Sequence, residues 1–443
     1  MKTREPIRLL RQYESRNVMF FERDGSWPIV WERASGVHVW DADGKKYLDL
    51  TAAFGVASAG HANPAVVRAG QRQMGKLLHA MGDVHPHELK ARLARELSAL
   101  TFERWAKLSK VQPRKLSGFS PKSKATSGKV IFGSSGFEAV EAALKTAVLA
   151  TGRRSVIAFE GAYHGLGYGA LNATHREHFR SPFRAQLREF GSFVKFPTTR
   201  AELKSVEQSL RKILRHEKIG AILVEPIQAR GGCNVPPPEF LPLLRKLCDQ
   251  HGALLILDEI YTGFGRTGKW FACEHSSVIP DLICLGKALT GGFPLSVCVG
   301  RADVMDAAWP VSTGEAIHTS TFLGHPVGCA MALAQIAEIK RLKLCERSAK
   351  FGKQLLKLLS TINSPLSTSR GLGLMVGLEL RRADGSPDTE KSLRVIKTML
   401  HRGFVILPEG EHGQVISFTP PLTISETQLR AAVNALVKTL DEE

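Results

Sequence analysis

The chain of 443 residues lacks the features that would place it in several specialised classes of protein. It has no apolar run approaching the ~20 residues of a membrane-spanning helix. Its charged N-terminus has no continuous apolar segment or small-residue cleavage site of the kind found in signal peptides. Its seven cysteines show no CxxC spacing and no histidine pair at ligand distance, so we expect reduced thiols and no metal site. These absences predict a cytoplasmic protein that does not enter a membrane.

The sequence also lacks nucleic-acid motifs, internal repeats and interleaved basic and aromatic residues, although its net charge is +18. Much of that charge lies in an expected insertion at 103–129, where residues 104–129 hold eight Lys or Arg and no acid. This stretch is rich in Ser, Pro and Gly and has little periodicity, which is typical of a solvated surface loop. We expect an inserted loop and no nucleic-acid partner, with a docking site for an acidic partner as the alternative.

The sequence does have an alternation of short apolar strands and helical patterns through its middle part. Strands separated by helices indicate βαβ units and an α/β fold with a mainly parallel sheet. Ligands bind such sheets outside the carboxyl ends of the strands. The C-terminal part mixes helical and strand patterns, which suits a smaller α+β domain. The expected strands are 129–135, 155–161, 219–227, 253–260, 281–289 and 294–300, and the expected helices are 137–150 and 238–252.

The expected strand "ALLILDEI" (253–260) ends in two acids although its other residues are apolar. Carboxylates are seldom fully buried unless a partner pairs with them, so Asp258 calls for a cation at the end of the strand. Lys287 lies at the corresponding end of another expected strand. In "GSSGFEA", Ser135 and Glu138 form a capping box that starts a helix. The free N–H groups of a helix start can bind an anion.

One ligand, pyridoxal phosphate (PLP), accounts for these groups together. Its phosphate would lie at the helix start, where Gly136 lets the backbone approach closely. Lys287 would form an imine, and Asp258 would keep the pyridinium nitrogen protonated. Tyr163, in the glycine-rich turn "FEGAYHGLGYGAL" (159–171), offers an aromatic ring to a flat ligand. Each feature alone has a structural explanation, a helix cap or a packing contact, but their combination predicts the cofactor.

The order of these motifs resembles class III (ω-type) aminotransferases, which are PLP enzymes of fold type I related to ornithine, acetylornithine and 4-aminobutyrate aminotransferases. The most specific part runs from "ILVEPIQARGG" (222–232) to "LGKALTGG" (285–292). Supporting motifs are "YLDLTAAFGVASAGHANPAVV" (47–67), "FGSSGFEAVEAALKTA" (132–147) and "HTSTFLGHPVGCA" (318–330). The resemblance implies a large PLP-binding domain and a small domain built from both ends of the chain, with limits at 1–80, 81–334 and 335–443.

The resemblance also implies a role for individual residues. Lys287 resembles the Schiff-base lysine, which also moves a proton between substrate and cofactor, and Asp258 resembles the pyridinium partner. Thr321 resembles a threonine that reaches the phosphate bound in the neighbouring subunit, which implies a homodimer with its active site at the subunit interface. The other implied cofactor contacts are Ser135, Gly136 and Phe137 at the phosphate, Tyr163 and Ile260 on the two ring faces, and Tyr261 in place of a glutamine near the phenolic oxygen.

The substrate side departs from the family pattern. Members that act on amino acids commonly read EPIQGE, and their second glutamate pairs with an arginine near the C-terminus that binds a substrate carboxylate. Here Arg230 stands at the glutamate position and Ser417 at the arginine position. We expect Arg230 to hold the carboxylate of one substrate; alternatively, it faces solvent and the enzyme prefers amines without a carboxylate. Phe54 stands where some members carry a tyrosine, which implies a more apolar pocket.

The implied reaction is a ping-pong transamination from an amine or ω-amino acid donor to a keto acid. An aminomutase or amino-acid racemase of the same fold is the alternative, since it would use the same cofactor residues without a keto-acid acceptor. A binding protein that only retains the fold is disfavoured because both Lys287 and Asp258 are present.

Overall fold

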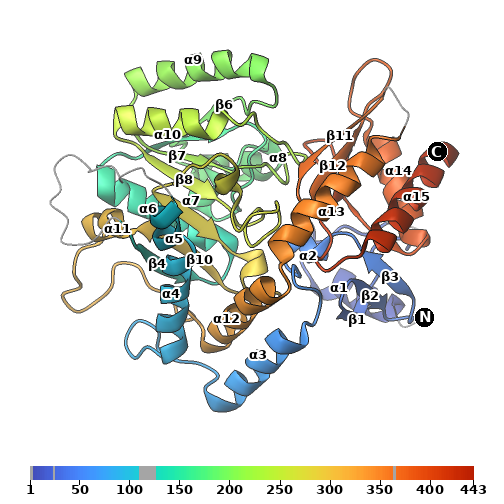
Figure 1. Ribbon diagram of the computed structural model, residues 1–443, viewed down its shortest axis with the longest axis horizontal. Coiled ribbons are helices and arrows are strands. Elements are labelled where there is room, and N and C mark those ends of the chain that lie inside the picture. The colour runs from blue at the N-terminus through green and yellow to red at the C-terminus, as the bar shows by residue number, and fades with distance from the viewer. Residues whose placement is uncertain (1–2, 23–24, 109–125, 363–365) are drawn as a thin grey trace.

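The largest sheet of the computed structural model, which describes residues 3–22, 25–108, 126–362 and 366–443, has seven strands with helices on both faces (Figure 1). In sheet order the strands are β4 (Gly128–Gly133), β10 (Ser296–Arg301), β9 (Leu282–Leu285), β8 (Leu254–Asp258), β7 (Ile219–Val224), β5 (Ser155–Phe159) and β6 (Gly191–Val194). The pairs from β9 to β6 are parallel, and β10 runs antiparallel to both β9 and β4. The sheet is mainly parallel, as predicted, although its expected strand at 294–300 runs against its neighbours.

Both faces of this sheet are buried, which explains why its strands are apolar without alternation. Successive residues point to opposite faces, so that Ile222 and Val224 of β7 belong to one hydrophobic core and Ala221 and Leu223 to another. Helices α4 (Glu88–Leu100), α5 (Phe102–Leu108), α9 (Arg200–His216), α10 (Phe240–His251) and α12 (Pro326–Arg341) contribute to the first core. The second core contains residues of α6 (Gly136–Thr151) and α11 (Ala302–Ala308).

The two ends of the chain meet in a smaller sheet of four strands, ordered β1 (Trp31–Ser35), β2 (His38–Asp41), β3 (Lys46–Asp49) and β13 (Phe404–Val405). Its last pair is parallel and joins the N-terminal segment to the C-terminal segment. A third sheet is C-terminal throughout, ordered β11 (Ser367–Leu372), β12 (Met375–Leu380), β15 (Val415–Phe418) and β14 (Leu407–Glu409). The domain limits at 80 and 334 stay predictions.

The remaining helices connect or cover these sheets. Helix α3 packs along α12 (Figure 1). The remaining helices are α1 (Arg4–Tyr13), α2 (Ala52–Gly55), α3 (Pro64–Lys76), α7 (Tyr168–Leu171), α8 (Glu177–Arg180), α13 (Leu344–Leu359), α14 (Thr389–His401) and α15 (Glu426–Glu442), with 3-10 turns η1 (Ser181–Gln186), η2 (Ala272–His275) and η3 (Lys287–Leu289).

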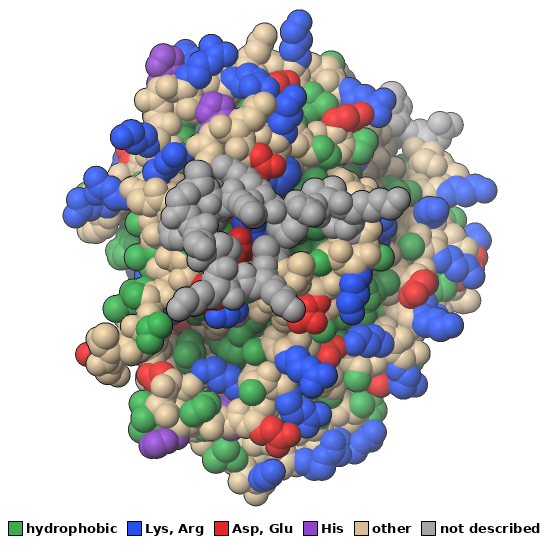
Figure 2. All heavy atoms as spheres, turned by 60° about the vertical axis from the view of Figure 1, so that its left-hand side comes forward, with side chains coloured by type: hydrophobic (Ala, Val, Ile, Leu, Met, Phe, Trp, Pro, Cys, Tyr) green, Lys and Arg blue, Asp and Glu red, His purple; other side chains and the backbone are tan. Residues whose placement is uncertain are grey.

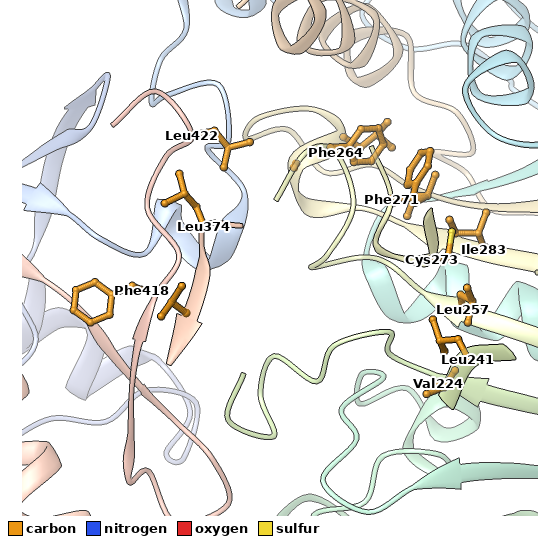
Figure 3. Packing of buried hydrophobic residues seen from close by; sticks show 14 of the residues in the cluster. Val224, Leu241, Leu257, Phe264, Phe271, Cys273, Ile283, Leu374, Phe418 and Leu422 are labelled. Carbon is orange, nitrogen blue, oxygen red and sulfur yellow. The ribbon is translucent and has the colours of Figure 1, made fainter. Parts of the chain in front are cut away.

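One hydrophobic core continues from the central sheet into the C-terminal sheet. Figure 3 shows this path from the strand residues Val224, Leu257 and Ile283, by way of Phe264 and Phe271, toward Leu374, Leu422 and Phe418. Because core packing is dense and resists deformation, a site between the two sheets is held on both sides.

The basic stretch 104–129 is only partly what the sequence predicted. Its first residues belong to α5, where Trp105 is buried and its indole N–H donates to Glu274 (3.2 Å). Its last residues begin β4. The prediction of a solvated loop is wrong at these two ends because Trp105 anchors the helix in the core and β4 pairs with β10. Residues 109–125 lie outside the described part of the chain.

Positive charge is not gathered in one patch on the visible part of the face in Figure 2. Lys and Arg side chains are scattered there, with acids among them. Within the described residues, no helix is both long and apolar enough to cross a membrane.

Candidate active site

A cavity of about 360 Å³ opens where β7, β8 and β9 end. This is the carboxyl edge of the parallel strands, where ligands of such sheets bind. Eight of the predicted site residues lie in its wall, namely Gly136, Phe137, Tyr163, Arg230, Asp258, Ile260, Tyr261 and Lys287. The sequence therefore predicted the location of the cavity and most of its lining.

Asp258, at the end of β8, is held in a fixed orientation. Its Oδ2 lies 2.8 Å from Nδ1 of His164, and its Oδ1 accepts the N–H of Ile260 (3.1 Å). Both side chains of the His164–Asp258 pair are buried. The carboxylate still reaches the cavity wall, so it can meet a cationic group of a ligand there.

Glu259, the second acid at the end of β8, is hydrogen-bonded to the protein itself and does not face the cavity. Its carboxylate accepts the N–H groups of Ala272 (2.7 Å) and Cys273 (2.8 Å) and the hydroxyl of Thr262 (2.7 Å). Burial raises the pKa of Glu259 to about 7. Glu259 therefore holds the 3-10 turn after β8 and is not part of the cavity wall.

Lys287 follows β9 in a strained backbone conformation. Its φ is +42°, a region that costs non-glycine residues about 1–3 kcal/mol and is found mainly at functional sites. Its Nζ lies 4.5 Å from the centre of the Tyr261 ring. Burial lowers the pKa of Lys287, and Arg230 acts in the same direction, although three nearby carboxyl groups oppose them. The amine is therefore more easily neutral, as a nucleophile must be.

Helix α6 starts beside this amine. The N–H groups of Ser134 and Ser135 both donate to Oε2 of Glu138 (2.7 Å each), which gives the expected cap at the helix start. At Gly136 a Cβ would lie 3.0 Å from Cδ1 of Ile260, so the first turn has little room for a side chain. Gly165, whose φ is +111°, packs directly against Phe137 and holds it in place. The helix start thus faces the cavity through its backbone.

Glu225 joins the two turns that carry Tyr163 and Arg230. Its buried carboxylate accepts the N–H of Tyr163 (3.0 Å) and the N–H of Ala229 (3.1 Å). Burial raises the pKa of Glu225 to about 7. Glu225 lies in the motif "EPIQAR", but nothing in the sequence indicates that it positions both turns.

Arg230 lies in the cavity wall with an acid behind it. Its Nε is 3.4 Å from Oε2 of Glu409, and its guanidinium carbon is 5.2 Å from the centre of the Tyr163 ring. The Arg230 side chain is 33% exposed and that of Glu409 is 6% exposed. Burial raises the pKa of Glu409 to about 7, while Arg230, Lys287 and a further arginine, Arg176, act to lower it.

Comparison with known proteins identifies the family. Residues 20–440 match the family described as aminotransferase class-III. The chain belongs to this family. It is 35% identical over 94% of both chains to the 5-aminovalerate aminotransferase of Pseudomonas aeruginosa. It is also 35% identical to the acetylornithine aminotransferase of Methanosarcina mazei, over 93% of this chain and 92% of that one.

A solved structure shows the same fold. The amine transaminase of an uncultivated Pseudomonas species, in its PLP-bound internal aldimine form, superposes with a TM-score of 0.84 at 26% identity, over 97% of this chain and 98% of that one. The chain is therefore a class III aminotransferase of fold type I. It is an enzyme that transfers an amino group between an amine donor and a keto acid.

Four predicted residues of this aminotransferase lie outside the cavity wall. Ser135 caps α6 next to it. Phe54 is 49% exposed. Thr321, which was predicted to reach the phosphate bound in a neighbouring subunit, is also exposed. Ser417 is buried in β15, with Oγ 3.5 Å from Sγ of Cys233. Thr321 and Ser417 do not line the cavity with Lys287, whereas the short helix α2 that carries Phe54 packs against the 3-10 turn η3 that begins at Lys287.

Besides Glu225, two residues that were not predicted from the sequence have a role in the aminotransferase site, His164 and Glu409. His164 lies next to Tyr163 in the motif "FEGAYHGLGYGAL", and the search for a partner of the buried Asp258 could have pointed to it. Glu409 has no such signal because it follows Arg230 far along the chain and pairs with it only in the folded protein.

Proposed function

We propose that this aminotransferase binds PLP in the cavity and that Lys287 attaches it. The observation that carries the proposal is that Lys287 lines the cavity together with the fixed pair of Asp258 and His164, at neighbouring strand ends. When bound, PLP supplies the electron sink that makes the substrate carbon acidic. The PLP-bound relative supports this assignment.

The chemistry of the cavity wall fits this cofactor. Asp258 offers a carboxylate to the pyridinium nitrogen, and the start of α6 at Gly136 offers N–H groups to the phosphate. Tyr163 and Ile260 offer the two surfaces between which a flat ring can lie. The hydroxyl of Tyr261 lies 3.2 Å from Oγ1 of Thr419, so its predicted contact with the phenolic oxygen requires this pair to rearrange or to share its hydrogen bond.

The side chains of the cavity then perform the transfer. With the cofactor bound, the amine of Lys287 would act as the general base and acid, because it would take a proton from the donor carbon that bears nitrogen and give that proton back. Over the whole reaction, the donor carbon loses its C–N bond and takes a carbonyl oxygen from water, while the acceptor carbonyl carbon gains the amino group and a proton and releases its oxygen as water. The donor is oxidised and the acceptor reduced, so no external oxidant is needed.

Chemical trapping tests the cofactor assignment. Borohydride reduction of the purified protein, followed by peptide mass spectrometry, should place a reduced pyridoxyl phosphate group on Lys287. The variant Lys287→Ala should carry none. A label on another lysine, or none after incubation with PLP, would contradict the assignment.

We propose further that Arg230 holds the carboxylate of the keto-acid substrate. It lines the cavity, and the acid behind it and the ring of Tyr163 constrain its guanidinium. Arginine suits this task because its planar fork matches a carboxylate. The alternative, an Arg230 that only faces solvent, is disfavoured because the side chain is one-third exposed.

The substitution Arg230→Ala tests this role. It should raise the KM for keto acids by roughly tenfold or more, the loss expected for one charged hydrogen-bonded contact. Arg200→Ala is the matched control, since Arg200 also pairs with an acid, Glu239, but is 74% exposed. An unchanged KM for keto acids in the Arg230 variant would refute the proposal.

We also propose a homodimer with Thr321 reaching the neighbouring cavity. The segment around Thr321 packs against another segment that exposes several large apolar side chains. Exposed patches of this kind mark interaction sites. The exposed residues are Met74, Leu77, Leu78, Met81, Val84 and Phe322.

The expected cytoplasmic location is part of the same proposal. All seven cysteines are free, and six of them are buried, which suits a reducing compartment.

A further inference from the structure

Tyr261 places an aromatic ring against the amine of Lys287 at the wall of the cavity. We infer that this ring is a cation–π partner that stabilises the protonated, unattached amine of Lys287, and that the Tyr261 hydroxyl anchors the ring. Tyr261 is then a positioning residue for proton transfer, a role that differs from the predicted contact with the phenolic oxygen of PLP. The inference rests on the proposed function, because it concerns the amine that acts there as general base and acid.

The geometry of the contact is that of a cation–π pair. Nζ of Lys287 lies over the ring of Tyr261, 4.5 Å from its centre, within the ~6 Å over which such pairs attract. The carboxylates that act on the pKa of this amine, those of Asp258, Glu225 and Glu409, are each held by other partners. In the described part of the chain, none of the three forms an ion pair with Nζ. The ring is therefore the partner that the fold offers to the ammonium form.

The hydroxyl of Tyr261 binds Thr419, which directly follows β15. The two oxygens are 3.2 Å apart, and Oγ1 of Thr419 donates its own proton to the carbonyl oxygen of Thr51 (3.1 Å). A threonine hydroxyl has a single proton, so Tyr261 is the donor in the first pair. Burial raises the pKa of Tyr261, so its hydroxyl keeps the proton that it donates. That proton is engaged by Thr419 and is not free for the phenolic oxygen of PLP.

A strained turn in the N-terminal segment holds the edge of the same ring. Four successive residues, from Ala52 to Gly55, have positive φ values of +47°, +48°, +60° and +77°. Such conformations are unfavourable for residues other than glycine and are found mainly at functional sites. At Gly55 a Cβ would lie 2.8 Å from Cε1 of Tyr261, so only a glycine lets the turn approach the ring this closely. The ring is thus held by its hydroxyl and along its edge, with a face toward the amine.

The ring adds a moderate attraction to the other influences on the amine. Burial and Arg230 lower the pKa of Lys287, whereas the three carboxylates named above act to raise it. Because the ring has no net charge, it favours the ammonium form less than a carboxylate in hydrogen-bonded contact would. The amine can therefore hold a proton after taking it and still give it up, as a general base and acid must.

The protonation of Lys287 can be measured directly on the full-length protein without cofactor. Trace labelling with acetic anhydride modifies only neutral amines, and peptide mass spectrometry reports the label on each lysine separately. A pH titration then gives the midpoint for Lys287. Lys45 is the internal reference, because it is an exposed lysine that lies 5.1 Å from the ring centre of a different tyrosine, Tyr47.

Two substitutions separate the ring from the hydroxyl. Tyr261→Leu removes the ring and should lower the midpoint, so that labelling of Lys287 at a pH below it rises about fivefold, the change that corresponds to ~1 kcal/mol of lost attraction. Tyr261→Phe keeps the ring and should change this labelling by less than about twofold. In both variants Lys45 should be labelled as in the native protein.

Ring fluorination tests the electrostatic contact without removing the ring. A trifluorinated phenylalanine introduced at position 261 keeps nearly the shape of phenylalanine but weakens the negative potential of the ring face. It should therefore raise the labelling of Lys287 in the same direction as Tyr261→Leu, and it does not depend on whether the leucine variant folds.

Two results would overturn the inference. One is an equal midpoint for Lys287 with the fluorinated and the unfluorinated phenylalanine ring. The other is a shift in Tyr261→Phe as large as that in Tyr261→Leu, which would assign the effect to the hydroxyl. Failure of the borohydride trapping to place PLP on Lys287 would instead refute the proposed function, and the two failures are distinguishable because the labelling is done without cofactor.

Discussion

At the scale of single residues, burial is the main cause of the pKa shifts of the titratable groups in and beside the cavity. Lys287 has its pKa lowered mainly by burial, whereas burial raises the pKa of Glu225 and Glu409 to about 7. Such opposed shifts in one cleft are typical of sites that transfer protons. The strained φ of Lys287 points to the same residue.

A buried acid next to the cavity predicts a dependence of stability on pH. The folded pKa of Glu259, about 7, lies above its ordinary 4.5, so the folded chain binds more protons than the unfolded chain between these values. Its stabilising contribution is complete below about pH 4.5 and is lost as the pH rises through about 7. In Glu259→Gln, the unfolding free energy should therefore fall less between pH 5 and pH 8, by at most about 3 kcal/mol.

Denaturant titrations at several pH values measure this difference. Glu239→Gln, at an acid that is 51% exposed, is the control and should follow the native curve. A Glu259 variant whose curve runs parallel to that of the native protein would show that Glu259 does not titrate in this range.

The sequence revealed residues whose role follows from a strand end or a helix start. Asp258 and Lys287 were predicted because each follows an apolar strand, and Gly136 because it follows a capping residue. The pairing of Arg230 with Glu409 could not be predicted, since β14 and the turn after β7 meet only through the packing of the two sheets. Ser417 was placed by analogy alone, and β15 turns it toward Cys233.

At the scale of elements, the start of α6 depends on the glycine-rich turn that packs over it. At Gly165 the φ is +111°, and a Cβ would lie 2.4 Å from the Cβ of Phe137. An alanine there would be strained and would also displace Phe137 from the cavity wall. The motif "YHGLGYG" therefore needs its first glycine for packing against α6.

The substitution Gly165→Ala should destabilise the fold and weaken PLP binding. We expect a loss of roughly 3 kcal/mol in unfolding free energy, from backbone strain plus overpacking. Gly385→Ala separates the two effects, since φ at Gly385 is +82° with nothing within 4 Å of an added Cβ, and strain alone should cost about 1 kcal/mol. Equal losses in denaturant titrations of the two variants would contradict the packing role of Gly165.

Secondary structure could be predicted from the sequence where the residues buried in the fold are those that the local apolar pattern of the strand or helix indicates. The six predicted strands of the central sheet and the two predicted helices, α6 and α10, lie within a few residues of their expected ranges, whereas strand β6 and helix α9 were not predicted. The antiparallel direction of β10 was not predictable because a strand buried on both faces has the same apolar composition in either direction. Helix α5 was missed because its basic residues obscured its two buried side chains, Phe102 and Trp105.

At the scale of the whole molecule, the exposed apolar residues between Met74 and Val84 form the surface that we propose as the dimer interface. Thr321 lies beside them, because His79 contacts Phe322 at 5.4 Å between ring centres. A partner at this surface would place Thr321 near a second cavity. Loss of the dimer would then also remove a residue from each active site.

A charge introduced into that surface should separate the subunits. Leu78→Glu should give a monomer in sedimentation experiments and lower PLP affinity, since the partner's contact to the phosphate would be lost. Leu393→Glu is the control, because Leu393 is also exposed but lies on α14, and it should keep the native mass. A Leu78 variant with native mass and native PLP affinity would contradict the proposed interface.

The central claim is PLP-dependent transamination at Lys287, and the visible absorption spectrum of the purified enzyme tests it most directly. We predict a band of bound PLP that bleaches when an amine donor is added and returns when a keto acid follows. A band that never bleaches while an amino acid is racemised or rearranged would instead indicate a racemase or aminomutase. No band after incubation with PLP would contradict the account.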